Sequence, residues 1–94
     1  MRRTALQLFT FYFEYDGGTY LSQIRASNYE EAPAVWAKSM DISSLPKPEV
    51  RFKEKLLASL DNEHPVPIDG LKNTWCCSLI FLKKALVHFT QTSE

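Results

Sequence analysis

Residues 9–26 alternate between apolar and polar side chains on both sides of Asp16-Gly17-Gly18, a pattern that predicts a β-hairpin. The turn residues supply the positive φ angles that tight hairpin turns require. A loop of even length, at Gly17-Gly18 or at Asp16-Gly17, puts the apolar side chains of both strands on one face. A three-residue loop would turn one strand over, so we expect an even loop. The face that is then almost wholly apolar carries Phe9, Phe11, Phe13, Tyr15, Tyr20, Ser22, Ile24 and Ala26.

The opposite face of this hairpin has a mixed composition. Threonine, glutamate and glutamine lie there beside tyrosine and leucine, which is typical of a sheet surface that faces water or a partner. Its residues are Thr10, Tyr12, Glu14, Thr19, Leu21, Gln23 and Arg25.

A helix is expected to follow the helix-start residues 27–31. Asn28 and Glu31 have capping-box spacing, as do Ser27 and Glu30. A proline inside a regular helix would lose a backbone hydrogen bond and clash with the preceding turn. Because of Pro33, the regular helix is expected to begin nearer Glu30 or Glu31. The apolar stripe at helical spacing consists of Tyr29, Ala32, Trp36 and Met40.

A second helix is expected over residues 49–60, and proline-containing segments flank it. Residues 41–48 predict a connector, and residues 61–73 predict a loop in which Pro65 and Pro67 enforce extended backbone. The apolar stripe of the second helix consists of Phe52, Leu56, Leu57 and Leu60.

Residues 74–92 fit both a hairpin that turns near Lys83-Lys84 and a helix. The continuous apolar run and the β-branched and aromatic residues favour the strands. An odd loop sets Trp75, Cys77, Leu79 and Phe81 on the face of Val87 and Phe89, with Ser78, His88 and Thr90 on the other face.

Together these elements predict a single α+β domain over residues 1–94, in the order ββααββ. Two hairpins form an antiparallel four-stranded sheet, and both helices pack on one face of it. A chain of 94 residues buries roughly 60–65% of its unfolded surface, which is enough for one modest core.

Eleven basic and eleven acidic residues give zero net charge. The chain therefore has no overall positive charge to attract nucleic acid or an anionic membrane. It also has no net charge that would make two copies repel each other. The longest apolar run, residues 75–82, is far shorter than the roughly 20 residues that span a bilayer. No secretory signal is visible, and two adjacent cysteines exclude a disulfide framework, so we expect a cytoplasmic protein.

Cys76 and Cys77 are the candidate redox or nucleophilic groups. On a strand they point to opposite faces and cannot bind one ion together, so core packing is the first interpretation. A small cysteine-dependent enzyme is the alternative, with His88 beside a cysteine across the final hairpin, but no third group orients it. Asp61, Glu63, His64 and Asp69 lack the spacing of a calcium or zinc site, so no metal or cofactor is predicted.

Weak binding of single-stranded nucleic acid is a further alternative. Arg25, Tyr12 and Lys72 would supply the basic and aromatic groups that such binding needs. The neutral overall charge and the acidic residues nearby argue against it.

The passage from the strand pair into Asn28-Tyr29-Glu30-Glu31-Ala32 resembles the passage from sheet into helix in HicB-type antitoxin domains. The resemblance covers about twenty residues, and the remaining features of that family, in particular a partner DNA-binding segment, are missing. No family is assigned. What the resemblance implies is that a small domain of this kind can work by binding alone.

We therefore expect a non-enzymatic protein-binding module, of antitoxin, immunity or regulatory type, that acts as a homodimer through the open face of its sheet. An exposed edge strand is a second route to partner recognition, and another protein is a further candidate partner. No catalytic residue is assigned. The predicted partner-binding residues are Tyr12, Leu21, Gln23, Arg25, Ile80 and His88.

Overall fold

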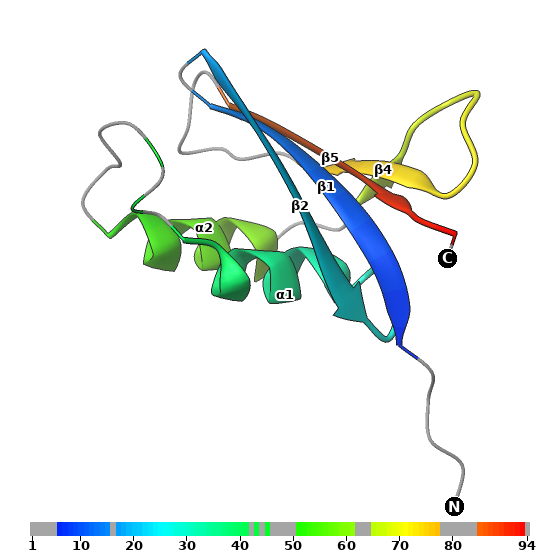
Figure 1. Ribbon diagram of the computed structural model, residues 1–94, viewed down its shortest axis with the longest axis horizontal. Helices are drawn as coiled ribbons and strands as arrows, with labels where there is room; N and C mark the ends of the chain where they lie inside the picture. Colours follow the sequence, from blue (N-terminus) through cyan, green and yellow to red (C-terminus); the bar gives the residue numbers. More distant parts are fainter. Residues whose placement is uncertain are drawn as a thin grey trace, which may run out of the picture.

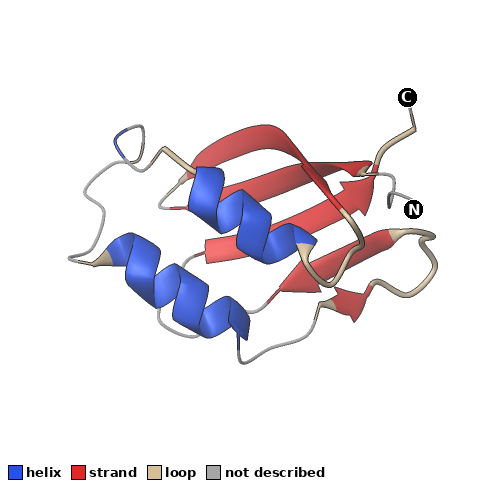
Figure 2. Cartoon of the chain, turned by 90° about the horizontal axis from the view of Figure 1, so that it is seen from below, coloured by secondary structure: helices blue, strands red, loops and turns tan. Residues whose placement is uncertain are grey.

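Five antiparallel strands form one sheet in the order β2-β1-β5-β4-β3, with helices on one face of it (Figure 1 and Figure 2). The computed structural model describes residues 6–15, 17–41, 43, 45, 51–61, 65–77 and 85–93. The strands are β1 (Gln7–Tyr15), β2 (Gly18–Ala26), β3 (Val66–Pro67), β4 (Thr74–Cys77) and β5 (Ala85–Gln91), and the helices are α1 (Ala32–Ser39) and α2 (Phe52–Asp61). The predicted α+β class is confirmed.

β1 and β2 form the predicted hairpin, and its loop is even. Tyr15 pairs with Gly18, so two residues separate the two paired strands. Gly17 has a φ of 81°, a backbone conformation that residues other than glycine rarely adopt. This register puts the predicted apolar set of both strands on one face.

The last segment of the chain is a strand pair, β4 and β5, as predicted. Trp75 lies opposite Phe89 and Cys77 lies opposite Val87, which is the odd-loop register. β5 also pairs with β1, so the two hairpins join in the middle of the sheet. The predicted turn falls within residues 78–84, which lie outside the described residues.

The four-stranded prediction is wrong, because a fifth strand, β3, forms within the segment predicted as a loop. Its two residues, Val66 and Pro67, pair with β4. The pairing continues through the Ile68 N–H, which donates to the Thr74 carbonyl at 3.0 Å. Pro67 lies in this strand, which agrees with the expected extended backbone, but two residues give no alternation from which a strand can be recognised.

α1 begins where Pro33 allows it. Glu31 is the N-cap residue, and its N–H donates to the Asn28 side-chain oxygen at 3.0 Å. Pro33 lies in the first turn, where its missing N–H removes no intrahelical hydrogen bond. The expected helix start near Glu31 is confirmed.

α2 begins at Phe52 rather than at residue 49, and residues 46–50 lie outside the described part of the chain. Its buried stripe consists of Phe52, Leu56 and Leu60. The Phe52 ring meets the ring of Tyr15 edge to face at 5.5 Å, and Lys53 Nζ donates to the Met40 carbonyl at 2.9 Å. Neither α1 nor α2 has the length and apolar character to cross a membrane.

Stacked aromatic rings connect α1 to the two strands at the centre of the sheet. The Trp36 ring stacks on Phe11 with centroids 5.0 Å apart, and Phe11 stacks on Phe89 at 4.6 Å. Phe13 meets Trp36 edge to face at 5.3 Å. All four side chains are buried, so this cluster makes the helix side of the sheet its core side.

The cluster predicts a large cost for truncating its central ring. We expect Trp36→Ala to lower the free energy of unfolding by about 3–5 kcal/mol, because the ring packs on both β1 and the neighbouring core. Urea unfolding followed by circular dichroism measures it. The exposed loop variant Leu71→Ala should change stability by no more than about 0.5 kcal/mol, and equal losses in both variants would contradict the assignment.

Candidate partner-binding face

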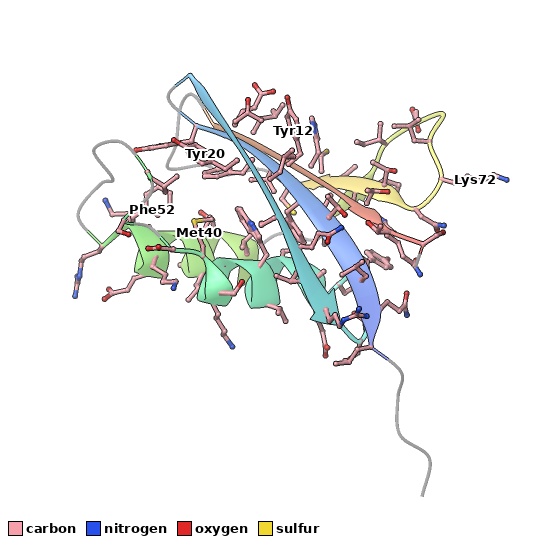
Figure 3. The ribbon with its side chains drawn as sticks, viewed as in Figure 1. Tyr12, Tyr20, Met40, Phe52 and Lys72 are labelled. Atoms are coloured by element: carbon pink, nitrogen blue, oxygen red, sulfur yellow. The ribbon has the colours of Figure 1, made fainter. Side chains whose placement is uncertain are left out.

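The face of the sheet opposite the helices carries a row of side chains that crosses all five strands. The register places these residues directly opposite one another in turn: Leu21, Tyr12, His88, Cys76 and Val66, called here the transverse row. Leu21 is 68% exposed, Val66 57% and Tyr12 38%. Figure 3 shows Tyr12 projecting from the side of the sheet away from the helices.

A second row, made mainly of threonines, runs beside the transverse row and is hydrogen-bonded within itself. The Gln23 side-chain amide donates to Thr10 Oγ1 at 3.0 Å, and Thr74 Oγ1 donates to Thr90 Oγ1 at 3.2 Å. The hydroxyls of Thr10 and Thr92 also form a hydrogen bond. A shallow apolar depression of about 240 Å³ lies between the two rows. The face therefore offers apolar groups beside hydroxyls that already have partners.

Most of the predicted partner-binding residues gather on this face. Tyr12, Leu21 and His88 are neighbours in the transverse row, and Gln23 lies in the threonine row. Arg25 lies towards the end of β2, opposite Leu8. Ile80 lies outside the described residues.

Sequence reasoning missed three residues of this face: Val66, Cys76 and Leu86. Val66 belongs to the strand that was predicted as loop. Leu86 lies two residues before His88 in β5 and thus on the same face, so the period-two spacing was the signal that could have found it. Leu86 is 46% exposed and widens the apolar area on β5.

Cys76 and Cys77 point to opposite faces, as the strand prediction requires. Cys77 is buried on the core side, and half-buried Cys76 lies opposite His88 on the open face. The ring of Tyr12 flanks His88 with centroids 6.4 Å apart. Within the described residues no hydrogen bond joins Cys76 to His88, and no three metal-capable side chains come together. The side chains of Asp61, Glu63 and His64 lie outside those residues.

A second hollow, of about 570 Å³, lies on the helix side between β2 and the end of α1. Its apolar lining includes Ile24, Trp36, Met40 and Leu45. Tyr20 is half-buried and Ser22 is exposed here, whereas Ile24 and Ala26 of the same face are buried. The expected apolar face of the first hairpin is therefore covered only over part of β2, since α1 ends at Ser39.

Asp41 lies at the end of this hollow, just beyond α1. The Ser43 hydroxyl donates to its carboxylate at 2.6 Å and the Ser43 N–H donates at 3.0 Å. These two hydrogen bonds lower the pKa of Asp41, and the charge of Lys53 lowers it further. Asp41 thus holds its negative charge at a lower pH than an isolated aspartate.

No protein-family model, curated protein or solved structure matches this chain. The sheet-to-helix resemblance to HicB-type antitoxin domains is thus not accompanied by a family match. Arguments about function therefore start from the geometry of the open face.

The positions of the two cysteines predict different thiol reactivities. In dilute native protein we expect Cys76 to react with an aromatic disulfide reagent, and Cys77 to react only after unfolding, because Cys77 is 8% exposed. Absorbance of the released thiolate measures both rates. Cys76→Ser should remove the faster phase, and two equally fast phases would contradict the assignment.

The hydrogen bonds to Asp41 predict a pH effect. Ser43→Ala removes the largest cause of the lowered pKa, so the Asp41 pKa should rise towards 3.8 while the backbone donor remains. Because the folded-state pKa is lowered, these bonds stabilise the protein above the unfolded pKa and lose that effect as the pH falls through the folded value. Carboxyl carbon NMR titration measures the shift, and an unchanged midpoint in Ser43→Ala would contradict it.

Proposed function

We propose that this chain is a non-enzymatic protein-binding module that acts as a homodimer through the open face of its sheet. The observation that carries the proposal is the transverse row, a line of partly exposed, mainly apolar side chains that neither helix covers. Contiguous exposed apolar groups with a polar rim are typical of protein interaction surfaces. The hydroxyls beside the row bond to one another, which lowers the cost of removing them from water.

The distribution of charges on the face supports pairing with a second copy. Glu14 lies near the turn of the first hairpin and Arg25 near its other end, both on the open face. Two faces stacked in opposite directions bring unlike charges together, and zero net charge leaves no overall repulsion.

The other two functions considered from the sequence have less support. A cysteine-dependent enzyme would use Cys76 and His88, but the described residues supply no third group to orient the imidazole. A nucleic-acid surface would need basic residues beside Tyr12, whereas Lys72 lies in the loop between β3 and β4 and points away from the sheet (Figure 3). We therefore retain the protein-binding function.

Self-association through the open face predicts a charge-sensitive oligomer. We expect the wild-type protein to sediment above its 10.8 kDa monomer mass at high micromolar concentration. Leu86→Glu should weaken association by about tenfold or more, because it places an unpaired charge in the contact. Sedimentation equilibrium measures the change.

The matched control is Leu71→Glu, because Leu71 is 58% exposed in the loop between β3 and β4. It should associate like the wild type. A wild-type protein that stays monomeric, or equal behaviour of the two glutamate variants, would overturn the open-face homodimer.

A further inference from the structure

The two edges of the sheet differ in how well they are protected against pairing. β3 has two residues, and Pro65 and Pro67 remove backbone donors there. β2, at the other edge, is nine residues long, contains no proline, and has Arg25 as its one charged side chain. A long edge without proline or several charges is a ready template for another strand.

The hairpin register shows which backbone groups of β2 face the edge. Tyr15 and Gly18 close a two-residue loop, so they form a hydrogen-bonded pair, and such pairs alternate along an antiparallel ladder. The N–H and C=O groups of the intervening β2 residues therefore point away from β1. These residues are Thr19, Leu21, Gln23 and Arg25.

We infer that β2 pairs antiparallel with β2 of a second copy about a two-fold axis at Ser22. Full overlap of Gly18–Ala26 with itself puts Ser22 opposite Ser22, and it puts Leu21 opposite Gln23. In this register the residues whose N–H and C=O groups point outward lie opposite each other in the two copies, so they can form the hydrogen-bonded pairs of an antiparallel ladder. Arg25 lies opposite Thr19, so no like charges oppose each other.

The second copy also completes the hollow beneath β2. In this register Tyr20 of one copy lies opposite Ile24 of the other, on the helix side, where Ile24 and Trp36 line the hollow. An aromatic ring beside a β-branched side chain is a favourable cross-strand pair. Ser22 is small enough to face its own copy at the axis. The half-buried Tyr20 and the exposed Ser22 thus acquire partners that a single copy does not give them.

The edge contact uses a surface separate from the open-face contact. Its two-fold axis is perpendicular to the sheet, so both helix layers lie on one side and the two open faces form one continuous surface. The edge contact thereby doubles the area of the open face that the proposed function uses, yet neither contact depends on the other. Each is therefore testable in a variant that lacks the other.

Oxidative cross-linking tests the axis directly. Residues opposite each other without mutual hydrogen bonds have Cα atoms about 4.5 Å apart, a separation that a disulfide spans. We expect Ser22→Cys to form an intermolecular disulfide between the two introduced thiols, identified by mass spectrometry of the linked peptides. Gln91→Cys, an exposed position on the inner strand β5, is the matched control. Equal linking rates in the two variants, or no linked Ser22→Cys peptide, would refute the contact.

Sedimentation of combined variants separates the two contacts. In the Leu86→Glu protein the edge contact should leave a dimer, and adding Ser22→Lys should weaken it by about tenfold or more, because two like charges then meet at the axis. Adding Gln91→Lys instead should leave that dimer unchanged. A monomeric Leu86→Glu protein would refute the edge contact and leave the open-face homodimer standing. A Leu86→Glu protein that associates like the wild type would refute the open-face homodimer and leave the edge contact standing.

Discussion

The stacking of Trp36 on Phe11, and of Phe11 on Phe89, is the contact on which the rest of the structure depends. It joins α1 to β1 and β5, which come from distant parts of the sequence. Large rings with few rotatable bonds bury much apolar area at a small entropic cost, so this contact decides which side of the sheet is the core. Figure 2 shows both helices on that one side of the sheet. The transverse row on the other side is therefore left at the surface.

The open face and the β2 edge are exposed for different reasons. The open face lies uncovered because the helices are committed to the aromatic core, and its threonines satisfy one another rather than water alone. The β2 edge is exposed because the sheet ends there, without the prolines that end it at β3. The open face follows from side-chain packing, whereas the β2 edge follows from backbone groups that point away from β1.

Patterns that are local in sequence predicted the parts of the fold that local chemistry decides. The Asp-Gly-Gly sequence and the alternation around it specify the first hairpin, and a loop of odd length puts Trp75 and Phe89 on the same face of the last. β3 was not predictable, because two residues become a strand only by pairing with β4. The line of Tyr12, His88 and Cys76 across strands depends on strand order, which no single segment contains.

Ser22 is where the expected pattern and the single chain disagree most clearly. It occupies a helix-side position next to an unfilled hollow, although the neighbouring Ile24 on the same face is buried. A local rule that a sequence breaks marks a site where another requirement applies. β2 presents Leu21 to the open face, Tyr20 to the hollow and its backbone to the edge, so this one strand carries residues of both proposed contacts. Under two-fold symmetry a substitution in β2 would enter the proposed edge contact twice, once from each copy.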